Sequence, residues 1–211
     1  MRTPTYRARG RTKRSGETRA RIMKATRELL DQGAFHDSTV EAIGERAGVS
    51  RATVYQHFPS RLDLVDALCD TFAENPALVR VRESVELEDL GAALRETIAD
   101  SMRFWSSEDG ILRQLYGVST VDPAARELVE RQLRDRRSEM RKLATRLDAG
   151  RALRSGVDRD AALAHLLVLT SYGTYRELRQ EGLSDKRIVE HVQSAAKRLL
   201  LAGSRGSSRS A

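Results

Sequence analysis

The sequence predicts an all-α protein, in which an amino-terminal three-helix unit precedes a longer helical bundle. Three observations lead to this fold class. Apolar residues recur every three or four positions through most of the chain, which is the period of an amphipathic helix. No stretch alternates apolar and polar residues as a half-buried strand does. Residues that favour helix ends stand where the apolar pattern starts and stops.

Basic residues are concentrated at the two ends of the chain. Residues 1–16 hold six Lys or Arg side chains and no acidic one, so we expect a disordered basic arm there. The tail over residues 203–211, also expected to be disordered, adds two arginines. The net charge of +7 therefore belongs to the ends and not to the body of the chain. A first helix is expected from about residue 18 to residue 32, with Gly33 ending it.

Residues 38–58 predict two short helices joined by one tight turn. Ser38 and Glu41 fit a Ser-x-x-Glu capping box at the start of the first helix. Gly48 tolerates the left-handed backbone that ends this helix, and Ser50 is a good N-cap for the next one. The layout is that of a helix-turn-helix, whose second helix lies in the major groove of DNA.

The second helix of this pair has an unusually polar outer face. Val54 and Phe58 are four residues apart and point inward together. Among the outer residue types, Arg can donate two hydrogen bonds to guanine, Gln can pair with adenine, and Ala can contact the thymine methyl. Thr, Tyr and His can donate to phosphate oxygens. An ordinary solvated helix pair is the alternative, and we favour DNA binding because caps, glycine turn and polar face coincide.

The same stretch resembles the amino-terminal domain of the tetracycline-repressor (TetR) family. The matching segments, within about residues 18 to 68, are Gly33-Ala34-Phe35, Thr39-Val40, Ile43-Gly44, Ala47-Gly48-Val49-Ser50, Thr53, Tyr55, His57-Phe58 and Ser60-Arg61-Leu62. Arg61 stands where the family often has Lys, and Gly44 stands where Ala is usual, which should weaken that helix slightly. The resemblance implies a homodimeric regulator, usually a repressor, that binds a palindromic operator and is released by a small-molecule effector.

The resemblance also assigns roles to individual residues. The expected base-contacting residues are Arg51, Ala52 and Gln56. The expected phosphate contacts are Thr39, Thr53, Tyr55, His57 and Arg61. Basic residues of the arm could enter the minor groove, as other helix-turn-helix arms do, or could only attract phosphates; the residues are Arg7, Arg9, Arg11, Lys13 and Arg14.

Beyond the helix-turn-helix, cap signals predict further helices. Ser60 with Asp63 opens one that should end near Asn75, with Pro76 closing it and a loop to residue 86. Later helices are expected over 87–105, 123–148, 158–181 and 184–202, with a short apolar helix or a bend over 111–118. The helix over 123–148 begins at Asp122-Pro123, an N-cap followed by proline at the first helical position. We expect a helix-turn-helix domain over 17–62 and a ligand-binding and dimerisation domain over 63–202.

The last two helices predict a dimer. Residues 161–169 are apolar nearly all round, and the final helix has an apolar stripe with small Ala residues. Both helices could simply face their own core. Because the TetR family dimerises through its last two helices, the resemblance favours a symmetric four-helix interface. The expected interface residues are Leu166, Leu169, Val192, Ala195, Ala196 and Leu199.

Bulky side chains of the middle helices fit either a plain core or a small-molecule pocket. Spacing alone favours a core, and the TetR resemblance favours an effector pocket. Its expected lining is Phe72, Met102, Trp105, Tyr116, Met140, His165 and Tyr172. A mostly apolar lining of this kind favours a hydrophobic or aromatic effector.

Two further features have competing interpretations. The arginine-rich run from Arg126 to Arg146 could be a second nucleic-acid surface, but interleaved acids at helical spacing favour a solvated face. Cys69 falls on an apolar stripe and is expected in the core, with a redox-sensor role as the alternative.

Other function classes lack their sequence signals. The four His residues are scattered without metal-ligand spacing, and the chain has no P-loop, GxSxG or Gly-rich dinucleotide turn. We therefore expect no enzyme, catalytic residue, cofactor or metal site. No apolar run is long enough to cross a bilayer, so we expect a cytoplasmic protein. The alternative function is a helix-turn-helix DNA-binding protein without small-molecule control.

Overall fold

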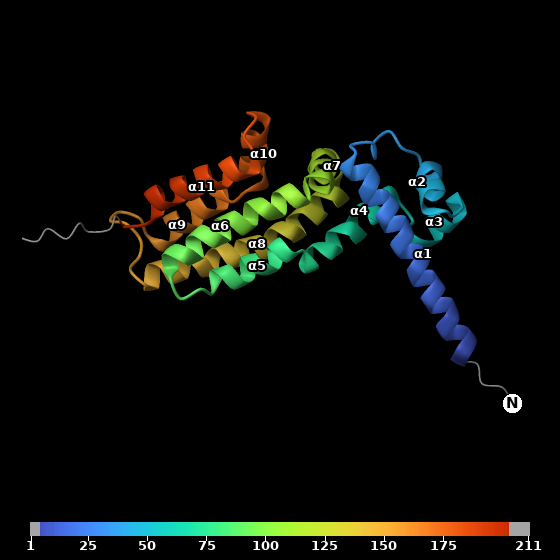
Figure 1. Cartoon of the computed structure of the whole chain (residues 1–211), viewed down its shortest axis with the longest axis horizontal. Helices are drawn as coiled ribbons and strands as arrows, with labels where there is room; N and C mark the ends of the chain where they lie inside the picture. The colour runs from blue at the N-terminus through green and yellow to red at the C-terminus, as the bar shows by residue number, and fades with distance from the viewer. Residues whose placement is uncertain (1–4, 203–211) are drawn as a thin grey trace, which may run out of the picture. The chain divides into compact units, whose positions relative to one another are not determined.

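The computed structural model describes the backbone of residues 5–202 and the side chains of residues 13–202. Within that part, the chain forms eleven α-helices and one short 3-10 helix, and extended pairing is limited to a single bridge between Leu153 and Leu201 (Figure 1). The all-α prediction is confirmed. The expected tail over residues 203–211 lies outside the described residues.

The chain divides into two compact units. The first comprises the residues up to Phe72 together with Glu108–Val129, and the second comprises Ala73–Ser107 and the chain from Glu130 onward. This division places the boundary of the first unit later than the expected domain boundary at residue 62. It also returns a distant segment, Glu108–Val129, to the amino-terminal unit.

The first unit is built around one long helix. Its helices are α1 (Thr5–Asp31), α2 (Val40–Ala47), α3 (Arg51–His57), α4 (Arg61–Asp70), α7 (Asp109–Ser119) and the beginning of α8 (Pro123–Ala149). Helix α1 packs against α2, α4 and α7. The buried face of α1 carries Ile22, Ala25 and Leu29 at helical spacing, and they meet a core that includes Ile43 and Phe58.

Helix α1 begins earlier than expected. Residues 5–16, predicted as part of a disordered arm, form its first turns, which extend past α2 and α3 (Figure 1). The prediction relied on charge repulsion. Arg, Lys and Ala are nevertheless among the best helix formers, and each of Gly10 and Gly16 costs only about 1 kcal/mol relative to Ala. Local propensity therefore continues the helix toward the amino terminus.

The second unit is a bundle with α6 at its centre. A short 3-10 helix η1 (Thr71–Glu74) leads into α5 (Pro76–Val85), α6 (Leu90–Ser107), the rest of α8, α9 (Arg159–Leu169), α10 (Tyr172–Gln180) and α11 (Asp185–Leu200). Helix α6 packs against α5, α10 and α11, and α11 also packs against α9. The core includes Ile98, Met140, Leu143, Leu166 and Ile188, none of which is exposed.

The loop expected after Pro76 is wrong, because this proline starts a helix. Asn75 caps α5 by accepting a 2.9 Å hydrogen bond from the backbone N–H of Ala77, and Pro76 is the first helical residue. Proline at this position loses nothing, since its missing N–H would have had no partner within the helix. The Asn-Pro pair is thus the same start signal as Asp122-Pro123.

The helix expected over 158–181 is broken in the middle, between α9 and α10. Ser171 caps α10 by accepting from the backbone N–H of Thr174 at 3.0 Å. The carbonyl oxygen of the buried Thr170 accepts from Trp105 Nε1 at 2.9 Å and from Arg136 Nε at 3.2 Å. Long-range donors therefore satisfy the end of α9, which spacing along one helix could not indicate.

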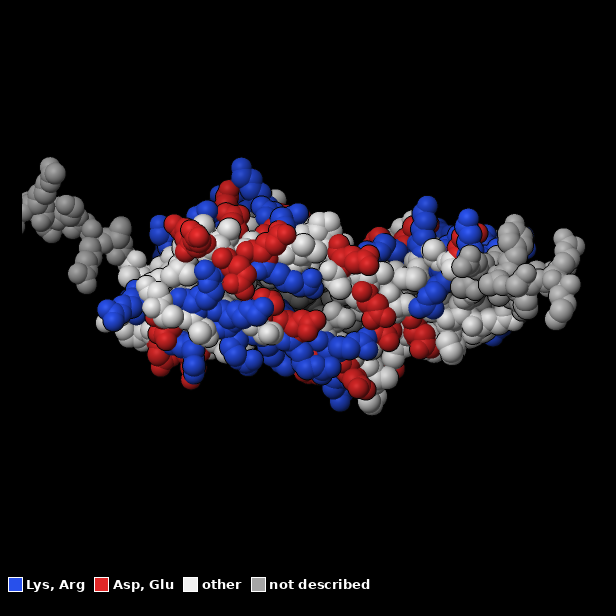
Figure 2. Space-filling model, turned by 90° about the horizontal axis from the view of Figure 1, so that it is seen from below, with Lys and Arg blue, Asp and Glu red and all other residues white. Residues whose placement is uncertain are grey.

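The face of the second unit seen in Figure 2 carries Lys and Arg in a broad band that Asp and Glu interrupt. On α8, Arg137 lies 3.3 Å from Glu130, and Lys142 lies 3.1 Å from Glu139. These pairs favour the solvated-face interpretation of the arginine-rich run. Cys69 is buried, as expected for a core residue. Within residues 5–202, no helix is both long and apolar enough to span a membrane.

Candidate nucleic-acid interface

The start of α2 differs from the expected capping box by one residue. Thr39 is the N-cap, and its Oγ1 accepts a 3.1 Å hydrogen bond from the backbone N–H of Ala42. The predicted Ser38–Glu41 box is therefore wrong. Ser38 Oγ instead donates to the carbonyl oxygen of Phe35 at 2.9 Å and closes the preceding turn. Thr39 and Ser38 are adjacent cap-type residues, and the turn before them decides which one caps α2.

The turn between α2 and α3 agrees with the sequence. Gly48 has a φ of 66°, in the left-handed region that glycine tolerates best. Ser50 caps α3 by accepting from the backbone N–H of Thr53 at 3.2 Å. The turn is also tight, because a Cβ added to Gly44 would lie only 2.8 Å from the carbonyl oxygen of Val49. Glycine at position 44 therefore permits a close approach of the two helices.

Helix α3 buries one face and exposes the other. Val54 and Phe58 are 1% and 2% exposed, as predicted. Both are held in the core of the first unit, which fixes the rotation of α3 about its own axis. The expected DNA-contacting side chains follow from that rotation: Arg51, Ala52, Tyr55 and Gln56 are exposed, and Thr53 and His57 are half-buried. Thr39 is exposed at the start of α2.

Arg51 is held by two neighbours. Its Nη1 lies 2.6 Å from Glu41 Oε1, and its guanidinium lies over the Tyr55 ring, 5.4 Å from the centroid. The backbone hydrogen bond at Glu41 lowers the pKa of that carboxyl, and the hydrogen bond and charge of Arg51 lower it further. The side chain of Tyr55, followed by Glu41, raises the pKa of Arg51. The first residue of α3 therefore carries an organised cation.

Arg61, the expected phosphate contact on α4, makes contacts within its own chain that the sequence analysis did not predict. Its Nη1 donates to the carbonyl oxygen of Ser38 and its Nη2 to that of Phe35. Its guanidinium also lies 4.2 Å from the centroid of the Phe35 ring, and burial lowers its pKa. Arg61 thus ties the loop before α2 to the start of α4. These loop carbonyls need donors, and a half-buried guanidinium supplies them.

Only part of the basic arm can be placed. The side chains of Arg7, Arg9 and Arg11 lie outside the described residues, whereas Lys13 and Arg14 are exposed on α1. Arg19 is a residue that the sequence analysis missed. Its Nη1 donates to the carbonyl oxygen of His57 at 3.2 Å, and its guanidinium lies 4.2 Å from the centroid of the Phe58 ring. The partner is 38 residues away, so local spacing could not reveal it.

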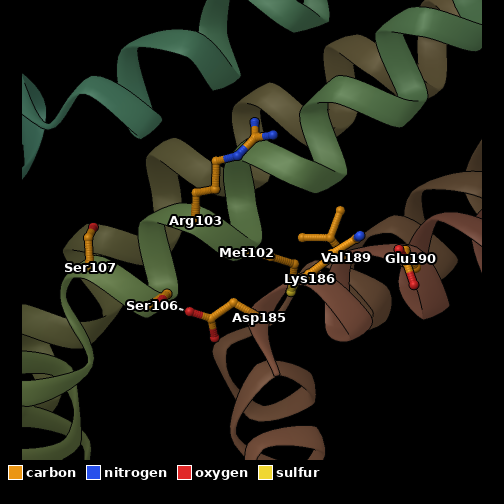
Figure 3. A pocket seen from close by; sticks show the side chains of 8 residues that line it. All are labelled: Met102, Arg103, Ser106, Ser107, Asp185, Lys186, Val189 and Glu190. Atoms are coloured by element: carbon orange, nitrogen blue, oxygen red, sulfur yellow. Dashed lines mark hydrogen bonds between the residues drawn. The ribbon is translucent and has the colours of Figure 1, made fainter. Parts of the chain in front are cut away.

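A cavity of about 420 Å³ lies in the second unit between α6 and α11 (Figure 3). Its lining is Met102, Arg103, Ser106, Ser107, Asp185, Lys186, Val189 and Glu190. Ser106 donates to Asp185 across it at 2.6 Å. Both signs of charge are present, so the lining is more polar than the expected pocket.

The seven residues expected to line an effector pocket do not come together in one unit. Phe72 and Tyr116 belong to the first unit, and the other five belong to the second. Met102 alone among the seven contributes to the cavity between α6 and α11. The rings of Trp105 and Tyr172 pack 5.6 Å apart, Met140 is fully buried, and His165 Nδ1 lies 2.8 Å from the carbonyl oxygen of Ala161.

The expected dimer residues divide into two groups. Leu166, Val192 and Ala196 are at most 3% exposed and lie in the core of their own chain, so they offer little surface to a partner. Leu169 and Ala195 are half-buried, and Leu199 is exposed. The large exposed apolar residue on α9 is Val168, at 66%. The sequence correctly indicated the apolar stripe of the last helix, but most of its residues are buried in the core of their own chain.

Residues 22–68 match the model of a family described as bacterial regulatory proteins, tetR family. The amino-terminal part of the chain, residues 22–68, is a DNA-binding domain of the TetR type. It is 38% identical over 69 residues to the HTH-type transcriptional regulator UidR of Escherichia coli K12, which covers 33% of this chain and 35% of UidR. The chain thus spans about a third of the length of the curated relatives that it matches first.

Solved structures resemble this chain over most of its length. A Saccharomonospora viridis protein described as a transcriptional regulator, solved in complex with choline, has a TM-score of 0.73 at 20% identity, covering 89% of this chain and 100% of that one. SmeT, the repressor of the Stenotrophomonas maltophilia multidrug efflux pump SmeDEF, has a TM-score of 0.66 at 19% identity, covering 89% and 94%. At these identities the likeness concerns the fold.

Proposed function

We propose that this chain is a DNA-binding transcriptional regulator that acts as a homodimer on a palindromic operator and responds to a small molecule. The observation that carries the proposal is the geometry of α3. Arg51, Ala52 and Gln56 are exposed on a helix whose opposite face is buried, in a helix-turn-helix of the TetR type. Side chains of these types can form the base contacts that a major groove offers.

Repression is the proposed sign of regulation. The relatives carry the names of transcriptional regulators, and SmeT is a repressor. A bound dimer on an operator excludes other proteins from that DNA, and this needs no further activity from the chain. Such a regulator acts where the DNA is, which for a bacterial protein is the cytoplasm.

The proposed dimer uses the faces of α9 and α11 that the chain does not bury. On α9, Ala164 and Val168 are exposed, and on α11, Leu199 is exposed beside the half-buried Ala195. Small residues permit close approach, and a two-fold interface would cover all of them at once. Two copies of α3 could then contact half-sites about one helical turn apart, as helix-turn-helix dimers do.

The proposed effector site is the cavity between α6 and α11. Its volume lies within the range of small-molecule sites, about 300–1,000 Å³. Met102 and Val189 supply an apolar part, while Arg103, Lys186 and Asp185 supply charges of both signs. This lining favours an effector that carries polar groups on a small apolar body. The hydrophobic or aromatic effector expected from the sequence has less support from this lining.

In the proposed mechanism, effector binding changes the separation of the two α3 helices in the dimer. Half-site spacing is a geometric requirement, so a displacement of a few ångströms lowers operator affinity. By linkage, an effector that weakens DNA binding must itself bind less tightly to the DNA-bound dimer. Coupling of this kind is typically about 1–3 kcal/mol.

Selection of bound fragments from random DNA with the purified chain tests the DNA-binding part. An operator with two-fold symmetry is expected. Arg51→Ala should then lose discrimination at one base position in each half-site, by about 1–3 kcal/mol. Arg61→Ala should weaken all sequences alike, because it releases the loop that leads into α2. A uniform loss of affinity in Arg51→Ala would contradict the assignment of the base contact.

A helix-turn-helix protein without small-molecule control is the second candidate. A thermal-shift screen with small polar and apolar compounds distinguishes the two. Stabilisation by a compound, lost when Met102→Arg fills the cavity between α6 and α11, supports effector control. If no compound stabilises the chain and Met102→Arg leaves operator binding unchanged, the simpler regulator is favoured.

A further inference from the structure

We propose that Glu41 is a specificity-determining residue, which holds Arg51 in a charge-neutral pair so that Arg51 binds a matching base and not any phosphate. The inference rests on the proposed DNA-binding function and adds a residue that makes no favourable contact with DNA itself. Glu41 acts through Arg51, and it is therefore a positioning residue.

The geometry confines the Arg51 guanidinium on two sides. Glu41 Oε1 lies 2.6 Å from Nη1, and the guanidinium carbon lies over the Tyr55 ring, 5.4 Å from its centroid. A guanidinium has five N–H donors in a planar fork, so donors beyond the one that contacts Glu41 are left for a base edge. The ion pair and the Tyr55 side chain together restrict the orientations of the guanidinium.

Glu41 places a negative charge close to the proposed DNA-binding surface. It lies near the start of α2, beside the helix proposed to enter the major groove, where phosphates repel an acid. Both members of the pair are about half exposed, with side-chain values of 58% for Arg51 and 49% for Glu41. Exposed pairs contribute only about 0–1 kcal/mol to folding. An acid in the first turn also stabilises the amino-terminal end of α2, and the same carboxyl lies where it can hold Arg51.

Neutralising Arg51 separates non-specific from specific binding. A free Arg attracts any phosphate and adds to the salt-dependent affinity that every sequence shares. A paired Arg carries no net charge with its partner and adds little of this attraction. A guanine in the major groove still offers two acceptors to the remaining N–H donors of Arg51, and a good bidentate contact discriminates by about 1–3 kcal/mol. The Glu41–Arg51 pair thus lowers the affinity for unrelated DNA more than it lowers the affinity for the matching operator.

Glu41→Gln tests this inference, and Glu45→Gln is the matched control. Glu45 is exposed on the same helix, and its substitution makes the same change in charge without touching Arg51. For each full-length variant, binding is measured to the selected operator, to an operator changed at the Arg51 position, and to unrelated duplex, across salt concentrations. Glu41→Gln should tighten unrelated-duplex binding about 3–10-fold, steepen its log–log salt slope by about 1, and lower discrimination at the changed position about 5–10-fold.

Glu45→Gln should tighten all three duplexes by similar factors and leave discrimination unchanged. In an Arg51→Ala background, Glu41→Gln should no longer alter discrimination, because its effect passes through Arg51. Equal behaviour of the two Gln variants would overturn the inference, and so would an undiminished Glu41→Gln effect without Arg51. If the unmodified chain prefers no duplex at all, the proposed function itself fails, which is a different result from either of these.

Discussion

The guanidinium of Arg27 lies 2.7 Å from Oε2 of Glu108 and joins the carboxy-terminal part of α1 to the residue that precedes α7. The Glu108 side chain is only 6% exposed, while that of Arg27 is 32% exposed. A buried carboxylate is costly without a cation or hydrogen-bond donors nearby. This pair therefore holds two helices of the first unit that lie far apart in sequence.

Arg27→Met should destabilise the first unit by about 1–3 kcal/mol, because it removes the cation from a buried carboxylate. The expected cost is below that of a fully buried pair, since water screens part of Arg27. Chemical denaturation should show the loss as a lower midpoint. Arg46→Met is the control, since Arg46 lies 4.0 Å from Glu28 with both side chains exposed, and should change stability by about 0.5 kcal/mol or less. Similar midpoints for the two variants would refute this.

Gly44→Ala should fail to stabilise α2, although helix propensity alone favours Ala over Gly by about 1 kcal/mol. The added Cβ would lie 2.8 Å from the Val49 carbonyl oxygen, so the turn must open. We expect a loss of about 0–2 kcal/mol. Gly117→Ala, on α7, meets nothing within 4 Å and should gain about 0.5–1 kcal/mol. Thermal unfolding of both variants measures the two changes in stability. Equal gains in stability would contradict the close approach of Gly44 to the Val49 carbonyl oxygen.

The carboxyl of Glu41 should titrate below its ordinary value of 4.5. The backbone hydrogen bond is the main cause, and Arg51 adds to it, so Arg51→Ala should raise the pKa part of the way back. Because the folded-state pKa is lowered, the stabilisation is present above the unfolded value and is lost as the pH falls through the folded value. Side-chain NMR titration measures this directly. If the titration midpoint of Glu41 is unchanged in Arg51→Ala, the Glu41–Arg51 ion pair does not form in solution.

Val168→Glu should raise the dissociation constant of the proposed dimer at least about tenfold, because it places a charge in an interface of apolar residues. Val121→Glu, at a residue that is 82% exposed in the first unit, makes the same chemical change away from that interface. It should leave the dimer intact. Sedimentation velocity over a range of concentrations measures both. If the Val168→Glu chain remains fully dimeric, this face of α9 is not part of the dimer interface.

Local signals predicted much of the fold. Ser50, Ser60 and Ser184 cap their helices as expected, and Gly48 ends α2 in the left-handed conformation. Each of these signals involves atoms within about four residues, so the sequence alone can indicate it. Other local signals were ambiguous and led to wrong predictions. Pro76 can end one helix or begin the next, and the choice depends on what the following helix packs against.

The candidate site was predicted in part for the same reason. The exposed face of α3 follows from the burial of Val54 and Phe58, which spacing alone indicates. The partners of Arg51 and Arg61 do not follow from spacing, because they lie 10 and 23 or more residues away in sequence. A guanidinium reaches whichever acceptor the fold brings close, and a sequence does not say which one that is.

Short-range physics thus determined the helices, the tight turn and the rotation of α3, since capping hydrogen bonds and apolar periodicity act within a few residues. The tertiary structure decided the rest. Leu166, Val192 and Ala196 are buried in the core of their own chain. Arg61 donates to loop carbonyl oxygens, and Glu41 forms an ion pair with Arg51. These outcomes depend on which surfaces meet when helices pack, and such contacts form between residues that the order of the chain keeps apart.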